Sequence, residues 1–533
     1  MFRAKRARGE DLASRQEALL PGSLESALAL ALSVTVLLAS VAFLERSSRL
    51  SRVMAELCGE SLRAEERAGL RSPRRAAPQL SADLVILISL DTLRADHLGV
   101  YGYARETAPH LRALAGEGVL FRTVGAQSAQ TLTSHKSLLT GKYPNTLMRE
   151  ETGADLVDLA NLGGDKKRYL VDTFTQVRPT LAELFRAGGF ATCALTDGAW
   201  MSRETGFQHG FEAFDDSGGG LEAILPRAAA WLATLGRARG FLFVHAYDVH
   251  CPYPTREPYD SAFCRDHGAH VELAGKCGKG ALFELALGAA ERAALVDHYD
   301  AGILSADAYL GEFFAALRAA GLYERALIVV TSDHGESLGE RGLLGHGGLH
   351  LEQLFVPLIV KPPRAWRLEP RVVDEPVELV DLHPTLLAFV GLPAPDDLDG
   401  RSLVPTLFRG VRGKDYLVAQ TTFEEAPEFR SSPAKRSLLR PGRWQILQDA
   451  ERGTASFYTL EHDPEGLLAH PVAAEEFALL LDLLLERHSP RPARRGREAR
   501  ADFSPEIELE LEALGYAGTQ REAAGDRSPA ALR

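Results

Sequence analysis

The chain of 533 residues contains only five cysteines and has no excess of basic charge. Five cysteines are too few for a disulfide framework in a chain of this length, which excludes the class of small disulfide-stabilised domains. The formal net charge of −12 excludes a general nucleic-acid-binding protein, which needs a basic face. The sequence also lacks a Walker loop and a dinucleotide-binding glycine fingerprint, so it gives no support to nucleotide-dependent phosphotransfer.

Long hydrophobic runs are also scarce, with one exception near the N-terminus. The 19 residues from Ser26 to Leu44 contain no charge and, at about 1.5 Å per helical residue, reach across the hydrocarbon core of a bilayer. A transmembrane helix is the leading interpretation, and a cleaved signal peptide or a buried helix are the alternatives. Five basic residues precede the run and predict a cytoplasmic N-terminus with the body of the protein outside: Arg3, Lys5, Arg6, Arg8 and Arg15.

The rest of the chain has the composition of a packed globular protein, with 45% hydrophobic and 25% charged residues. Apolar runs at Leu84–Leu90, Gly240–Ala246 and Ala326–Thr331 are typical of strands that are buried on both faces of a parallel sheet. Helical patterns separate them, including one from Leu282 to Ala320 and one that begins near Ser134. This alternation predicts an α/β fold with a doubly wound, mostly parallel sheet flanked by helices.

The composition changes after about Gly410, where we expect a small C-terminal α+β subdomain. Its predicted elements are strands at Arg443–Leu447 and Ser456–Leu460, a loop at Ser431–Pro441 and a helix at Glu475–Arg487. Cys264 and Cys277 flank a glycine-rich insertion in the main body, and the residues alone leave open whether they form a disulfide.

Polar residues follow three of the predicted buried strands. Asp91 follows the first, Asp248 and His250 follow the second, and Asp333 with His334 follow the third. Because the carboxyl ends of parallel strands meet at one edge of a sheet, these residues should share one site. Aspartate and histidine are metal ligands, so the site should hold a divalent ion.

Five segments in this order resemble the sulfatase family of the alkaline-phosphatase superfamily. They read ILISLDTLRADHLGVYGYARETAPHLRALAGEGVLF (Ile86–Phe121), TLTSHKSLLTGKYP (Thr131–Pro144), FLFVHAYDVHCPY (Phe241–Tyr253), VVTSDHGESLGERG (Val329–Gly342) and VELVDLHPTLLAFVGLPAPDDLDGRSL (Val377–Leu403). The resemblance implies an alkaline-phosphatase-like fold and a nucleophile at a helix N-terminus, next to a divalent metal.

The nucleophile segment departs from the family pattern. Sulfatases carry a cysteine or serine that becomes formylglycine, followed by proline and arginine, whereas this chain has Thr131, Thr133 and His135 at those positions. Threonine cannot become formylglycine, and at this position it resembles the phosphoryl-transferring branches, in which its metal-bound hydroxyl attacks phosphorus. Ser134 is the alternative nucleophile, and a helix-capping threonine is the structural alternative.

The resemblance assigns the metal to Asp91, Asp333 and His334. Sulfatases have two consecutive aspartates where this chain has Asp91 and Thr92, and they tend to have asparagine where it has His334. Imidazole favours zinc or manganese, while calcium or magnesium stays open. A second metal held by Asp248, His250 and His346 also stays open.

Several further side chains are assigned by the same comparison. His135, His250 and His346 are expected to bind or protonate the ester. His245, His350 and His383 are expected to pack or cap, and Lys136 to lie on a solvated helix face. Asp96 and His97 are expected to be structural or to support the metal ligands from behind.

We therefore predict metal-dependent hydrolysis of sulfate or phosphate esters by a membrane-anchored enzyme whose body lies in the periplasm. The alternatives are phosphoethanolamine-transferase-like transfer to an envelope lipid or glycan, and an inactive binding module. The predicted divisions are a basic cytoplasmic N-terminus (1–25), a transmembrane helix (26–44), a stalk (45–80), a sulfatase-like catalytic domain (82–410), a C-terminal subdomain (411–517) and a disordered tail (518–533).

Overall fold

The computed structural model describes residues 80–147, 178–253, 257–263, 283–284, 287–411, 413–421, 435–449 and 454–472. All of them belong to the second of two compact units into which the chain divides, Ala77–Arg533. In these ranges no helix has both the length and the apolar character needed to cross a bilayer. The predicted membrane segment, the stalk up to residue 79, the helix at 475–487, the tail at 518–533 and the cysteines at 264 and 277 lie outside the described residues.

A sheet of eight strands forms the centre of the fold, in the order β12-β2-β11-β8-β1-β6-β4-β5. In chain order the strands are β1 (Leu84–Leu90), β2 (Val119–Phe121), β4 (Ala191–Leu195), β5 (Ala213–Asp215), β6 (Gly240–Ala246), β8 (Ala326–Thr331), β11 (Leu358–Lys361) and β12 (Arg371–Val373). Strand β11 runs antiparallel to both of its neighbours, and the other pairings are parallel. The predicted fold class is confirmed.

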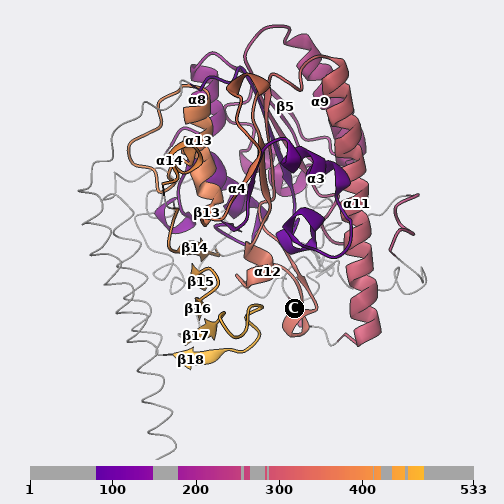
Figure 1. Ribbon diagram of the computed structural model, residues 1–533, viewed down its shortest axis with the longest axis vertical. Helices are drawn as coiled ribbons and strands as arrows, with labels where there is room; N and C mark the ends of the chain where they lie inside the picture. The colour runs from indigo at the N-terminus through magenta and orange to yellow at the C-terminus, as the bar shows by residue number, and fades with distance from the viewer. Residues whose placement is uncertain are drawn as a thin grey trace, which may run out of the picture. The chain divides into compact units, whose positions relative to one another are not determined.

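Helices cover both faces of this sheet (Figure 1). Alternate residues of β1 point to opposite sides, so Val85 and Leu87 belong to one apolar core and Ile86 and Ile88 to the other. The first core is closed by α4 (Thr131–Thr140), α8 (Leu181–Ala187) and α13 (Leu382–Phe389). The second is closed by α3 (Pro109–Gly116), α9 (Gly220–Thr234) and α11 (Ala289–Ala319).

The middle of the sheet determines where the polar residues meet. Strand β1 lies between β6 and β8 and is parallel to both, so the carboxyl ends of the three strands lie together. Residue Ser89 is in register with His245 of β6 and Thr331 of β8. Ser89, His245 and Thr331 therefore form a polar row near the carboxyl ends of these three strands. The row lies beneath helix α4, because Ser89 follows Leu87 on the same face.

Shorter elements complete the main body. Two small sheets are formed by β3 (Val124–Gly125) with β13 (Val377–Glu378), and by β7 (Phe283–Glu284), β9 (Ser337–Leu338) and β10 (Leu343–Gly345). Helices α12 (Leu351–Leu354) and α14 (Val404–Arg409) lie on connections. The predicted helix from Leu282 is therefore too long at its start, since residues 283–284 pair with β10 as a strand and helix α11 begins at Ala289.

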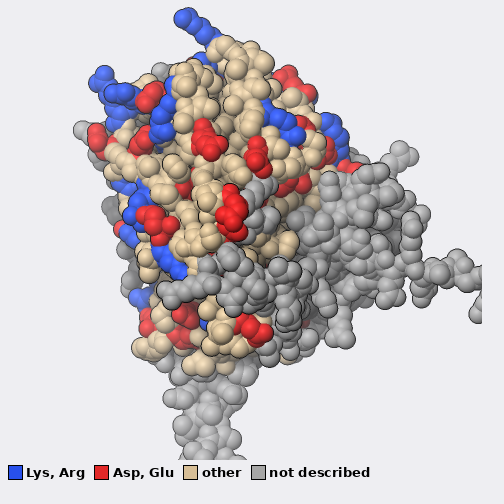
Figure 2. Space-filling model, turned by 90° about the vertical axis from the view of Figure 1, so that its right-hand side faces the viewer, with Lys and Arg blue, Asp and Glu red and all other residues tan. Residues whose placement is uncertain are grey.

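The C-terminal part contains an antiparallel sheet of five strands: β14 (Leu417–Gln420), β15 (Lys435–Arg440), β16 (Trp444–Asp449), β17 (Thr454–Thr459) and β18 (His470–Val472). The prediction of a loop at Ser431–Pro441 is wrong, because Lys435–Arg440 pairs with β14 and β16. The segment KRSLLR lacks the apolar–polar alternation that indicates a strand, and its Arg436 is buried. On the face shown in Figure 2, acidic and basic side chains of the described residues are interspersed.

Candidate metal centre and active site

Two neighbouring strands deliver the predicted metal ligands to one place. Asp91 follows β1 directly, and Asp333 and His334 follow β8 after one serine. All three side chains are fully buried, and one ligand atom from each lies within 4.8 Å of the others. The structure thus brings together the three residues that the sequence assigned to the metal.

Each carboxylate has one oxygen held by the protein and one that accepts no hydrogen bond from the described residues. Oδ1 of Asp333 accepts the backbone N–H of His334 at 2.9 Å and that of Thr92 at 3.4 Å, whereas its Oδ2 accepts none. Oδ2 of Asp91 lies 3.0 Å from Nε2 of His245, whereas its Oδ1 accepts none. Two buried oxygens without donors are expected at a cation site, because such atoms are costly to bury otherwise.

His334 presents a nitrogen to the same point. Its Nδ1 donates to the carbonyl of Gly335 at 3.0 Å, which leaves the lone pair on Nε2. That Nε2 lies 3.3 Å from Oδ2 of Asp333 and 4.0 Å from Oδ1 of Asp91. The atoms without donors and the lone pair of His334 therefore converge.

The electrostatics of the pocket also favour a cation. Burial raises the pKa of Asp91 to about 7, although the neighbouring side chains of Asp333 and Thr131 act to lower it. Burial, and then the charge of Asp91, raise the pKa of Asp333 well above its usual value. Burial also lowers the pKa of His334 well below its usual value, so the imidazole is neutral. A divalent ion would compensate two carboxylates that destabilise each other here.

The donor set fits a metal ion. Two carboxylate oxygens and one imidazole nitrogen are ligands that zinc and manganese accept, whereas calcium prefers oxygen alone. A second group, formed by His135, His245 and Asp333, also has ligand atoms within 4.8 Å of one another. Both ring nitrogens of its His135 already make hydrogen bonds, since Nδ1 lies 2.8 Å from the carbonyl of Thr131 and Nε2 lies 2.9 Å from the hydroxyl of Ser89. The first group is therefore the better metal site.

Thr131 stands beside these ligands, at the first residue of helix α4. Its Oγ1 lies 3.4 Å from Nε2 of His334. The N-terminus of a ten-residue helix adds partial positive charge at this point, which favours an anionic substrate. Ser134, the alternative nucleophile, donates its hydroxyl to the carbonyl of Asp333 at 2.7 Å. The geometry therefore favours the Thr131 hydroxyl.

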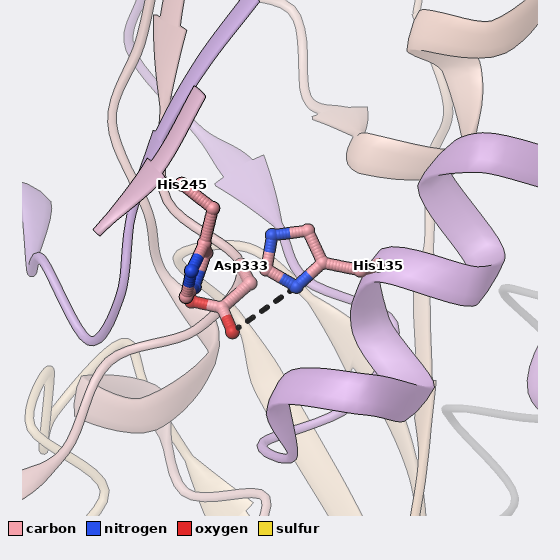
Figure 3. Close-up of side chains that lie close together, drawn as sticks. All are labelled: His135, His245 and Asp333. Atoms are coloured by element: carbon pink, nitrogen blue, oxygen red, sulfur yellow. Dashed lines mark ion pairs between the residues drawn. The ribbon is translucent and has the colours of Figure 1, made fainter. Parts of the chain in front are cut away.

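His135 lies deeper than its predicted role in ester binding requires. Figure 3 shows it projecting from helix α4 toward the carboxylate of Asp333, with His245 beside it. Its Nδ1 lies 3.6 Å from Oδ2 of Asp333, and its ring packs edge-on against Phe207 and Phe243. Burial lowers the pKa of His135 to about 4, so the ring is neutral. These contacts suit a residue that supports helix α4 and Asp333.

His250 and His346 form a pair on another side of His334. Their Nε2 atoms lie 3.3 Å apart, and the ring of His346 lies 4.4 Å from that of His334. Each Nδ1 donates to a backbone carbonyl, of Cys251 at 2.5 Å and of Ala129 at 2.9 Å. Asp248 is oriented elsewhere, since its Oδ2 accepts the backbone N–H of Leu221 at the start of helix α9. The predicted second-metal trio therefore reduces to the two histidines.

Four other residues that the sequence singled out make contacts of their own. His97 pairs with Asp300, and Asp96 pairs with Arg94. Neither His97 nor Asp96 belongs to the metal group. His383 packs with its Nδ1 on the carbonyl of Leu139. Lys136 is buried and does not lie on a solvated face.

His245 is predicted from the sequence to pack or cap, whereas in the structure it contacts Asp91, one of the three candidate metal ligands. The available signal was its position as the one polar side chain in the run GFLFVHA, directly before the carboxyl end of a buried strand. Cys193 and Cys251 are buried free thiols.

The comparisons with known proteins identify the family of the chain. The sequence profile of the family described as Sulfatase matches residues 83–392, more than half of the chain. The chain therefore belongs to the sulfatase family, and the resemblance carried by the five segments is confirmed.

Individual relatives match over stretches of different length. The multifunctional alkaline phosphatase superfamily protein PehA of Trinickia caryophylli is 39% identical over 108 residues, which cover 20% of this chain and 21% of that protein. Arylsulfatase K of Xenopus laevis is 36% identical over 177 residues, or 32% of each chain. An arylsulfatase of Clostridium perfringens is 24% identical over 465 residues, covering 75% of this chain and 92% of the relative. The chain thus spans about a fifth to a third of the first two relatives.

Solved structures share the fold. A phosphonate monoester hydrolase of Agrobacterium radiobacter superposes with a TM-score of 0.58 at 22% identity, covering 76% of this chain and 96% of that one. A protein solved in complex with its substrate D-glucosamine-2-N,6-O-disulfate superposes with a TM-score of 0.56 at 17% identity, covering 76% and 97%. At these identities the likeness shows the fold alone.

Proposed function

We propose that the protein is a metal-dependent hydrolase of phosphate or sulfate esters in which Thr131 is the nucleophile. The observation that carries the proposal is the position of the Thr131 hydroxyl at the start of helix α4, 3.4 Å from Nε2 of His334 and beside the buried carboxylates of Asp91 and Asp333. Sulfatase-family membership and the phosphonate monoester hydrolase neighbour support ester cleavage.

Asp91, Asp333 and His334 would hold the ion. When bound there, a divalent ion supplies positive charge that lowers the pKa of a neighbouring hydroxyl and offsets the charge of the ester. The Thr131 hydroxyl gives up its proton, and Oγ1 attacks the phosphorus or sulfur in line with the departing alcohol. The bond to the alcohol oxygen breaks, and that oxygen takes up a proton. Water then attacks the ester of Thr131: its OH stays on the released phosphate or sulfate, and its other proton regenerates the Thr131 hydroxyl. Threonine favours phosphate esters, because it cannot supply the formylglycine used in sulfate ester cleavage.

The pair of His250 and His346 serves the oxygens of the ester. Both Nδ1 atoms donate to backbone carbonyls, so a single proton shared between the two Nε2 atoms would turn the pair into a donor toward the leaving oxygen. The alternative is a second transition-metal ion, since two nitrogens bound to one tetrahedral zinc are roughly 3.3 Å apart when each bond is about 2.0 Å. Metal stoichiometry separates the two.

We also propose that the enzyme is anchored by residues 26–44, with its N-terminus in the cytoplasm and its body in the periplasm. The 19-residue apolar run and the basic residues before it support this topology. An anchored hydrolase acts on substrates within reach of the membrane, so an envelope glycan or lipid is the expected substrate class. A neighbour solved with a disulfated glucosamine supports the glycan.

The test uses the full-length chain, purified in detergent and loaded in turn with zinc, manganese and calcium. Hydrolysis of an aryl phosphate, an aryl phosphodiester and an aryl sulfate is compared between the wild type and Thr131→Ala. We expect phosphate-ester turnover that the variant loses. Turnover that survives in Thr131→Ala contradicts the assigned nucleophile. A wild type that binds no metal contradicts the enzyme and favours an inactive binding module.

A further inference from the structure

His245 occupies a fully buried position next to a metal ligand. It lies at the carboxyl end of strand β6, in register with Ser89 of β1, and its Nε2 donates to Oδ2 of Asp91 at 3.0 Å. The ring is fixed from two sides, because it packs edge-on against His135, with ring centroids 5.0 Å apart, and against Tyr247, at 4.7 Å. The imidazole therefore cannot turn away from Asp91 without repacking the core.

Packing alone does not account for a histidine at this position. The Nδ1 of His245 has no hydrogen-bond partner among the described residues, and burying such an atom costs free energy. Phenylalanine would fill a similar volume without this cost, as Phe243 does two residues earlier on the same face. What histidine supplies and phenylalanine does not is the N–H that holds Asp91.

The carboxylate of Asp333 is also held at one oxygen only. There, backbone N–H groups of His334 and Thr92 hold Oδ1 and leave Oδ2 for the cation. Oδ2 of Asp91 has a side chain, that of His245, in the equivalent role. A carboxylate held at one oxygen cannot rotate freely, so its other oxygen stays directed at the pocket.

We propose that His245 is a positioning residue that orients Asp91 so that its Oδ1 faces Asp333, His334 and Thr131 in the metal pocket. This role rests on the proposed metal centre. It predicts that removal of the N–H weakens metal binding by about 10–100-fold, the usual effect of losing a hydrogen bond behind a metal ligand.

Three variants of the full-length chain test the role. His245→Phe keeps the ring and removes the donor, whereas His245→Gln keeps an N–H near the position of Nε2. The matched control is His383→Phe, because His383 is equally buried but its Nδ1 lies on the carbonyl of Leu139 in another part of the core. Binding of Mn²⁺ and Zn²⁺ is measured by calorimetric titration, with thermal unfolding of the metal-free protein as the check on folding.

We expect His245→Phe to raise the Kd for metal 10–100-fold, and His245→Gln and His383→Phe to stay within a few-fold of the wild type. At saturating metal His245→Phe should lower kcat with little change in KM, because Asp91 does not hold the substrate. Equal metal affinity of His245→Phe and wild type, or equal loss in His245→Gln and His245→Phe, contradicts the positioning role. Asp333→Asn is run alongside, and if it binds metal as the wild type does, the metal centre itself is wrong.

Discussion

The Nε2 atoms of His250 and His346 face each other at 3.3 Å, while both Nδ1 atoms donate to backbone carbonyls. Two lone pairs at this distance repel unless a proton or a cation lies between them. Burial lowers the pKa of His250 to about 3 and that of His346 well below its usual value, so neither ring carries a second proton, on Nε2, at neutral pH. The pair is thus prepared to act as one unit.

A double-mutant cycle tests this unit. We expect His250→Ala and His346→Ala each to lower kcat by about 10²–10⁴-fold, the usual contribution of acid–base residues, and the double variant to be little worse than either alone. Multiplying effects would show that the two histidines act independently. Metal content of the wild type, at one or two ions per chain, then decides between a shared proton and a second ion.

Asp333 is expected to be essential for the metal. Its Oδ2 accepts no hydrogen bond in the described part of the chain and lies 3.3 Å from Nε2 of His334. Asp333→Ala removes one of three ligands, and we expect metal affinity to fall by more than about 100-fold, beyond the effect of losing an outer hydrogen bond. Elemental analysis after dialysis measures the loss. Retained metal together with retained turnover in this variant would contradict the site.

Thr131 and Ser134 are distinguished by their hydrogen bonds. Ser134 donates to the carbonyl of Asp333 at 2.7 Å, so Ser134→Ala should cost roughly 1 kcal/mol of unfolding free energy and retain the chemistry. Thr131→Ala should abolish phosphate-ester turnover, and Thr131→Ser should restore a measurable part of it. Mass spectrometry of the quenched reaction, with fragmentation of the peptide that contains both residues, should locate the phosphoryl group on Thr131. A label on Ser134 would reverse the assignment.

Metal binding should depend on pH through Asp91. Its pKa is raised to about 7 by burial in the metal-free protein, so the ion must displace a proton below that pH. We expect the apparent affinity to weaken as pH falls below about 7 and proton release to be measurable by titration in buffers of different ionisation enthalpy. In Asp91→Asn the share of this release that comes from Asp91 should disappear and that of Asp333, whose pKa burial also raises, should remain. An unchanged release would assign it to another group.

Stability of the metal-free protein should depend on pH with the opposite sign for histidine and aspartate. Burial lowers the pKa of His135 to about 4 and of His245 to about 3, so below the unfolded value near 6.5 the unfolded chain binds more protons and stability rises with pH from about 4 to 6.5. The raised pKa of Asp91 has the opposite effect, because the folded chain then binds more protons, so stability falls as the pH rises from about 4 to about 7. Denaturation curves of the wild type and Asp91→Asn across this window separate the two contributions.

A prediction away from the site concerns Lys414. Its ammonium lies 2.8 Å from Asp381 and also pairs with Glu378, and both carboxylates are buried. Lys414→Met leaves these charges without their cation, so we expect a loss of about 3–5 kcal/mol in unfolding free energy. Urea denaturation measures it. Lys414 lies outside the metal pocket, so metal affinity of the folded variant should not change.

The predictability of the fold followed the hydrophobic pattern. Strands β1, β6 and β8 have the bounds that their apolar runs predict, because a strand buried on both faces leaves no ambiguity about its ends. Helix α4 begins at Thr131, three residues before the predicted start, since its fully buried surface carries no amphipathic signal. The strand at Lys435–Arg440 was missed because its charged residues became buried only through pairing with β14 and β16.

The sequence alone was enough to predict the fold class, from apolar runs that alternate with helical patterns, and the family, from the resemblance of five segments. It also predicted which three residues gather as candidate metal ligands, because Asp91, Asp333 and His334 follow the carboxyl ends of two buried strands. It could not determine which oxygen of Asp91 is held and which is left for a cation, nor that His245 holds it. Nor could it show that Asp248 accepts a hydrogen bond from helix α9 or that His135 contacts Ser89. Those facts depend on strand register and on the packing of α4 and α9 against the sheet, so residues up to about 240 positions apart come within hydrogen-bond distance only when the whole fold has formed.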